Sequence, residues 1–109
     1  MRLILPSYQY YPIGAIVGHV GEGNFHTIFP IHEENKAEMQ TAWRLSNSIV
    51  HLALRAGGTC TGEHGVGQGK MAYLPEELGE VTYGLMREIK KTLDPRGIMN
   101  PGKVFPCEM

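Results

Sequence analysis

The sequence has few of the features that mark several large classes of protein. Its only two cysteines, Cys60 and Cys107, form no C-x-x-C pair, so neither a disulfide scaffold nor a thiolate zinc site is indicated. Ten Lys and Arg against eleven Asp and Glu give a formal charge of -1, which leaves no basic footprint for nucleic acid or an anionic lipid surface. No apolar run approaches the roughly 18 residues of a transmembrane helix.

What remains is the composition of an ordinary globular domain. The chain has 109 residues, of which 42% are hydrophobic and 19% charged, so the default expectation is one soluble intracellular domain. Glycine is the exception, because 14 glycines are nearly double the average share of about 7%. They cluster in residues 18–23, 57–69 and 97–102, and these three stretches also hold most of the candidate chemistry.

The first half of the chain predicts a hairpin followed by a helix. Residues 1–12 have no clear period and are treated as an irregular lead-in, and the remaining residues, 13–109, as one domain. Two β-rich runs flank residues 21–24, which predicts a hairpin with a four-residue loop, and Pro30 suits a strand end. Asn35, with Glu38 three positions later, is a candidate N-cap. A helix of about twenty residues follows and ends at the glycines 57–58.

The second half predicts another helix and a turn-rich tail. Pro75 is typical of a helix start, and Asp94, which precedes a proline, ends the segment. Its apolar stripe comprises Leu78, Val81, Leu85, Ile89 and Leu93. The predicted fold class is therefore α+β with a small antiparallel sheet.

Two histidines flank the predicted hairpin loop. With residues 21–24 as the loop, Val20 faces Phe25, and the next pair outward is His19 opposite His26. Cross-strand side chains on one face have Cβ atoms about 4.5 to 5.5 Å apart, so both imidazoles could ligate one divalent metal. Two ordinary sheet histidines are the alternative.

The glycine-rich stretch from residue 57 to 70 contains an adjacent acid and base, Glu63 and His64. In an extended backbone their side chains point to opposite sides, so that one could complete a metal site while the other faces a substrate. A mobile surface loop with incidental polar residues is the alternative. Lys70 follows a glycine, but Met71 comes next and the phosphate-loop spacing is missing, so nucleotide binding by that route is not supported.

Three other side chains are expected to have ordinary structural roles. His32 precedes a predicted helix and His51 lies within it, so a solvated or capping role is expected for both. Cys60 is expected to be a small buried hydrophobe rather than a nucleophile.

Three strings together resemble one family. They are GHVGEGNFH at residues 18–26, GTCTGEHGVG at 58–67 and LDPRGIMNPGK at 93–103. They resemble the C-terminal part of FAD-linked oxidases of the vanillyl-alcohol oxidase superfamily, closest to cytochrome-type D-lactate dehydrogenases, with glycolate oxidase and D-2-hydroxyglutarate dehydrogenase as relatives. The resemblance implies half of a ferredoxin-like substrate domain, with a tail that returns to an FAD-binding domain.

The resemblance also implies roles for individual residues. In metal-dependent members, the residues matching His19, His26 and Glu63 bind a divalent ion, with zinc as the expected metal, and the residue matching His64 takes the hydroxyl proton of the substrate. Asn24 and Asn100 match positions near the flavin or the substrate. The implied reaction is oxidation of a small 2-hydroxy acid, D-lactate to pyruvate, with hydride transfer to flavin. Glu22 stands where the family more often has Asp, which removes none of these ligands.

The FAD-binding domain of the family is not contained in these 109 residues. The isolated chain is therefore expected not to turn over a hydroxy acid, and to need a flavin-binding domain or subunit. Its uncovered sheet edge and apolar helix faces predict a homo-oligomer or a covering partner. A stand-alone metal-binding or oligomerising α+β module without redox activity is the alternative. The expected location is the cytoplasm, including the inner face of a bacterial membrane, with the mitochondrial matrix as the alternative.

Overall fold

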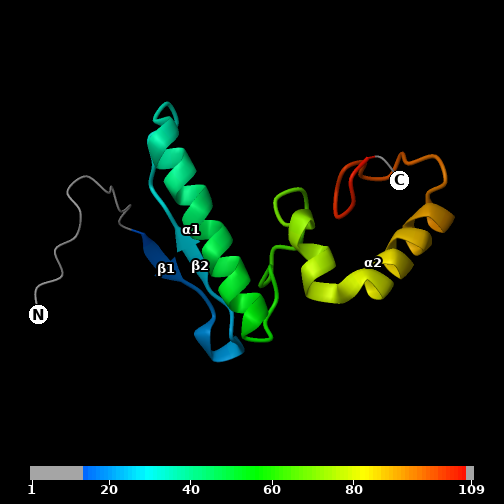
Figure 1. Ribbon diagram of the computed structural model, residues 1–109, viewed down its shortest axis with the longest axis horizontal. Coiled ribbons are helices and arrows are strands. Elements are labelled where there is room, and N and C mark those ends of the chain that lie inside the picture. The colour runs from blue at the N-terminus through cyan, green and yellow to red at the C-terminus, as the bar shows by residue number, and fades with distance from the viewer. Residues whose placement is uncertain (1–13, 108–109) are drawn as a thin grey trace, which may run out of the picture. The chain divides into compact units, whose positions relative to one another are not determined.

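The computed structural model describes residues 14–107, so the lead-in assigned to residues 1–12 lies outside the described residues. The chain divides into two compact units, one up to Ile49 and the other from Val50. Figure 1 shows the order of the elements along the chain: a hairpin, a long helix, a loop region and a second helix followed by a tail. The α+β class predicted from the sequence is confirmed.

The first unit begins with a two-stranded antiparallel sheet. Strand β1 spans Ala15–Val17, strand β2 spans His26–Ile28, and a short 3-10 turn, η1, spans Val20–Glu22 between them. The ladder pairs Ala15 with Ile28 and Val17 with His26. Strand β2 ends two residues before Pro30, as expected for a residue that cannot donate to a ladder.

Helix α1, Lys36–Arg55, begins at the predicted N-cap. The Asn35 Oδ1 atom accepts hydrogen bonds from the amides of Ala37 and Glu38, at 3.1 and 3.3 Å. The buried Glu38 carboxylate accepts in return from Asn35 Nδ2 at 2.8 Å and from the His32 amide at 2.8 Å. This amide holds the pKa of Glu38 below its usual value. His32 therefore has the capping role expected for it.

The predicted glycine stop of α1 is also confirmed. The amide of Gly58 donates to the Ala53 carbonyl at 2.8 Å, and that of Gly57 donates to the Leu54 carbonyl at 3.0 Å. Gly57 has a φ of 78°, the left-handed conformation in which helices commonly end on glycine.

Helix α2, Leu74–Leu93, follows a short 3-10 turn, η2, at Met71–Tyr73. It starts one residue before the predicted Pro75. Gly79 interrupts it with φ 75° and ψ 159°, a conformation essentially restricted to glycine. Helical periodicity predicted one uninterrupted apolar stripe, but the break separates Leu78, which packs on the core, from the residues that follow.

The core of the second unit is small. Val50, Cys60 and Leu74 are buried and form its centre. Partly buried apolar side chains pack against this centre: Leu54, Val66, Tyr73, Leu78, Tyr83 and Val104. Cys60 is thus the buried hydrophobe expected from the sequence, with 6% of its surface exposed.

One face of α2 is left uncovered after the Gly79 break. Val81, Leu85, Ile89 and Leu93 recur every four residues and are 88%, 62%, 51% and 74% exposed. Such a stripe is what helices normally bury against another element. Within residues 14–107, no helix has the length and apolarity needed to cross a membrane.

Candidate functional site

The hairpin loop differs from the sequence prediction. Val17, and not His19, is the ladder partner of His26, so the predicted cross-strand pair of histidines is wrong. The connection between the strands runs from residue 18 to residue 25, twice the predicted four residues. His19 lies in this loop, at the N-cap of η1, and His26 is the first residue of β2.

The physical reason for the longer loop lies in its backbone. A Cβ atom on Gly18 would lie 2.4 Å from the Asn24 carbonyl oxygen and 2.4 Å from the Phe25 Cα atom, so the chain crosses itself closely there. The His19 carbonyl accepts hydrogen bonds from the amides of Glu22 and Asn24, at 2.8 and 3.3 Å. These local bonds close a turn where strand alternation predicted further ladder pairs.

Asn24 is the residue before last of this loop. Its Oδ1 atom is shielded from solvent and accepts no hydrogen bond among the described residues. A buried hydrogen-bond acceptor without a donor is unfavourable in a folded protein. This atom is therefore a candidate contact for a bound group.

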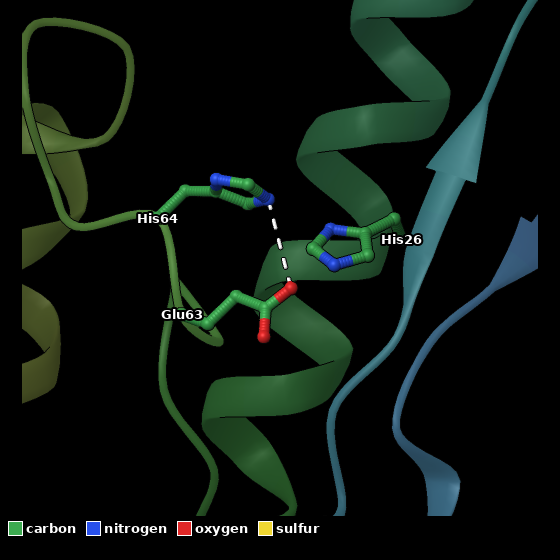
Figure 2. A group of neighbouring side chains, drawn as sticks. All are labelled: His26, Glu63 and His64. Carbon is green, nitrogen blue, oxygen red and sulfur yellow. Dashed lines mark ion pairs between the residues drawn. The ribbon is translucent and has the colours of Figure 1, made fainter.

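The glycine-rich loop of the second unit carries Glu63 and His64. Glu63 Oε1 lies 3.7 Å from His64 Nε2, and the two side chains are 41% and 77% exposed. Figure 2 shows both side chains on the same side of the loop, and it also draws His26 on β2. The expected divergence of Glu63 and His64 is wrong, because residues 62–64 form bends and not an extended strand.

Side chains hold this loop at several points. Thr61 Oγ1 donates to the Gly65 carbonyl at 3.0 Å, and the Cys60 amide donates to Glu77 Oε2 at 2.8 Å. Burial, with the Glu77 carboxylate adding to it, raises the pKa of Cys60 to about 11. The thiol is thus neutral at ordinary pH, which makes it a poor nucleophile.

Asn100 lies in the tail, where a buried carboxylate organises the chain. Asp94, which is 5% exposed, accepts from the amides of Ile98 at 3.0 Å and Met99 at 2.9 Å, and from Lys90 Nζ at 2.6 Å. The Lys90 ammonium, with help from these amides, holds the pKa of Asp94 below its usual range. Asn100 follows directly, is exposed, and has a φ of 47°.

His51 has a partner that the sequence did not indicate. Its Nδ1 atom lies 3.0 Å from Glu76 Oε2, and its ring meets that of Tyr73 edge-on at 5.7 Å. The pairing joins the C-terminal half of α1 to the first turn of α2. It is a structural contact within the second unit.

Two anchoring residues were also missed. Asp94 was predicted only to end the second helix, and Glu77 lies in its first turn, whereas both accept hydrogen bonds from loop amides. For Asp94 a signal was present, since Asp at the start of a Pro- and Gly-containing turn commonly accepts hydrogen bonds from amides of the residues that follow it. For Glu77 no local signal exists, because its partner is 17 residues away.

The candidate residues supply definite chemical groups. Imidazole nitrogen and carboxylate oxygen, the donors of His19, His26 and Glu63, are ligands of zinc and similar divalent ions. His64 adds an exposed imidazole, the side-chain group that most often acts as a general base. The donor set therefore fits a divalent ion. Within residues 14–107, Glu63 and His64 are the candidate residues that lie side by side in a single unit.

Comparison with known proteins agrees with these motifs. Residues 8–104 match the family described as FAD linked oxidases, C-terminal domain. The chain is 52% identical over 92 residues to the mitochondrial D-lactate dehydrogenase [cytochrome] of Arabidopsis thaliana, covering 84% of this chain and 16% of that protein. It is 55% identical over 96 residues to the mitochondrial D-lactate dehydrogenase [cytochrome] 1 of Saccharomyces cerevisiae, covering 88% and 16%.

A relative with a different name shares the same region. The chain is 42% identical over 88 residues to a glycolate oxidase subunit of Bacillus subtilis, covering 81% of this chain and 19% of that subunit. The chain thus spans less than a fifth of the length of these relatives. With nearly its whole length matched, the chain belongs to the FAD linked oxidase C-terminal domain family.

Proposed function

We propose that this chain is the C-terminal catalytic segment of an FAD-dependent, metal-assisted D-2-hydroxy-acid dehydrogenase that oxidises D-lactate to pyruvate. The observation that carries the proposal is the identity of 52% over 92 residues and of 55% over 96 residues to two D-lactate dehydrogenases. The exposed His64 ring beside Glu63 supports it, because an accessible base is what removal of a hydroxyl proton requires.

Each candidate residue has a place in this chemistry. His64 takes the proton of the substrate hydroxyl on its ring nitrogen, while the hydrogen on Cα leaves with its electron pair and the C–O bond becomes a carbonyl. FAD, when bound, supplies the acceptor for that hydride. His19, His26 and Glu63 hold a divalent ion, expected to be zinc, whose charge favours loss of the hydroxyl proton. Asn24 and Asn100 contact flavin or substrate.

The uncovered stripe on α2 supports a covering partner. Four large apolar side chains along one helix face, each at least half exposed, form a larger apolar patch than the surface of a soluble protein normally exposes. The flavin-binding part of a longer enzyme is the partner that family membership suggests. Self-association of the isolated chain is the second way to cover the stripe. The mitochondrial names of two relatives support a mitochondrial location over the cytoplasm.

A chimera tests the proposed activity. Residues of this chain replace the matching 92-residue segment of the Arabidopsis enzyme, and D-lactate is added without an electron acceptor while flavin absorbance is followed. Bleaching by D-lactate is expected. His64→Ala should lower the rate by roughly 100- to 10,000-fold with flavin and metal content unchanged. A loaded chimera that never reduces its flavin would contradict the proposal.

Metal analysis separates the alternative function, a metal-binding module without redox activity. The adjacent ligand-type atoms of Glu63 and His64 favour this candidate. Metal content of the 109-residue chain, wild type beside His19→Ala, shows whether a site forms without the flavin part. Stoichiometric metal in the wild-type chain, together with an inactive chimera, would favour the module.

The covering partner is tested on the same chimera. Leu85→Glu places a charge in the centre of the stripe and is expected to lower the yield of flavin-loaded protein. Thr82→Glu changes an exposed neighbour outside the stripe and is expected to have no such effect. Solution mass of the isolated 109-residue chain, with and without Leu85→Glu, shows whether the stripe drives self-association. Equal yields for both chimera variants would contradict the partner proposal.

A further inference from the structure

The loop that carries Glu63 and His64 is fixed at both ends. At its start, the Cys60 amide donates to Glu77 Oε2 at 2.8 Å, and the Cys60 side chain lies in the core. At its end, the Val104 amide donates to the Gly67 carbonyl at 2.7 Å. These two hydrogen bonds fix the ends of the loop, but neither involves residues 61–65, which form its tip.

One side chain bridges the tip itself. Thr61 Oγ1 donates to the Gly65 carbonyl at 3.0 Å, so a hydrogen bond closes a five-residue segment with Glu63 and His64 inside it. The Thr61 carbonyl in turn accepts from Thr59 Oγ1 at 2.6 Å. Thr61 is thus bound to Thr59 through its carbonyl and to Gly65, across the tip, through its hydroxyl.

The tip needs such a bridge because its backbone is unusually free. Gly65 has a φ of 79° and open space where a Cβ would lie, and Gly62 precedes the acid. Glycine has the largest backbone freedom to lose on ordering. The side chains of Glu63 and His64 are 41% and 77% exposed, so neither is fixed by burial in the core. A hydrogen bond across the tip therefore restricts where the carboxylate and the imidazole point.

We propose that Thr61 is a positioning residue, whose hydroxyl holds the Glu63 and His64 pair in the arrangement used for catalysis. The inference rests on the proposed function for the roles of these two residues. Its structural half, that the hydroxyl orders the tip, stands independently. A reacting group displaced by about 1 Å costs on the order of 100-fold in rate, so loss of the bridge is expected to slow the reaction without unfolding the protein.

The structural half is tested on the 109-residue chain by heteronuclear NOE measurements on the amides of residues 62–64. Thr61→Val keeps the shape of the side chain and removes the hydroxyl, and Thr61→Ser restores it. Thr92→Val is the matched control, because Thr92 also donates to a backbone carbonyl, that of Glu88 at 2.8 Å, on an exposed face of α2. Lower NOE values at 62–64 are expected in Thr61→Val alone. Equal values in all four proteins would overturn the proposal.

The catalytic half is tested by kinetics of the chimera. Thr61→Val is expected to lower kcat by roughly 10- to 100-fold with little change in KM, Tm or flavin content. Thr61→Ser should recover most of that loss, and Thr92→Val should match the wild type. A parallel fall of Tm or flavin content would make Thr61 merely structural and overturn the proposal. An inactive wild-type chimera would contradict the proposed function, while the NOE comparison would still decide the role of the hydroxyl.

Discussion

The two loops that carry the candidate ligands are built by different means. The hairpin loop of the first unit is closed by its backbone. The His19 carbonyl accepts hydrogen bonds from two amides, and the backbone at Gly18 lies close to that of Asn24 and Phe25. In the glycine-rich loop of the second unit, side chains tie the backbone, with the Thr61 hydroxyl and the Glu77 carboxylate as the links.

This difference decides which substitutions each loop tolerates. A loop closed by its backbone is disrupted when a side chain is added where two segments cross. A loop closed by side chains is disrupted when those side chains lose their polar atoms. The hairpin loop should therefore be sensitive to volume at one glycine, and the glycine-rich loop to single functional groups.

The largest effect is expected for Gly18→Ala. The added Cβ would lie 2.4 Å from backbone atoms of Asn24 and Phe25, which have no rotamer to escape into. Destabilisation by about 3 kcal/mol is expected for overpacking this severe, measured by urea unfolding of the 109-residue chain. Gly21→Ala is the control, because its Cβ would meet no atom within 4 Å. Equal stabilities would show that the two segments do not cross as closely as described.

A smaller effect is expected for Gly65→Ala in the other loop. No atom lies within 4 Å of the added Cβ, so the cost comes only from the φ of 79°. Roughly 1 to 2 kcal/mol is expected for a left-handed alanine. Gly69→Ala, which also has open space and lacks the positive φ, should be close to neutral in the same unfolding measurement. If both glycine variants lose the same stability, the left-handed conformation of Gly65 is not the cause.

Local signals in the sequence were sufficient for much of this fold. The start of α1 at Asn35 and its end at the glycines 57–58 follow from capping chemistry that involves residues within six positions of one another. The same holds for the arrest of β2 before Pro30. Each of these features depends on a few neighbouring residues, which is the range over which a sequence pattern is informative.

The sequence failed where a glycine or a distant partner decided the geometry. Alternation extended the hairpin through Gly18, but a glycine permits a backbone crossing that no periodicity encodes. The same freedom interrupts α2 at Gly79. The glycine-rich loop was treated as extended, whereas its bends place Glu63 and His64 3.7 Å apart. The roles of the candidate residues came from resemblance, and they stay predictions.

Loss of the α1 cap provides a moderate test within the first unit. Asn35→Ala removes the oxygen that accepts the amides of Ala37 and Glu38. A cost of about 1 kcal/mol is expected from the loss of an N-cap, while Asn35→Ser, whose hydroxyl can both accept and donate a hydrogen bond, should keep most of the stability. Gln40→Ala, at an exposed position inside the helix, serves as the control in urea unfolding. An Asn35→Ala variant as stable as the control would mean that Glu38 alone secures this end of the helix.

The smallest change probes the Glu77 link without altering the fold. Because the pKa of Cys60 is raised from 9.0 to about 11, its thiolate fraction at pH 8 is roughly 100-fold lower than that of an ordinary thiol. Brief alkylation followed by mass spectrometry should therefore modify the exposed Cys107 first. Labelling of Cys60 should accelerate as pH rises toward 11. Glu77→Gln keeps an acceptor for the Cys60 amide but removes the charge that opposes the thiolate, so Cys60 should label faster at a given pH. An unchanged rate would mean that burial alone protects the thiol and that the Glu77 charge has no part in raising its pKa.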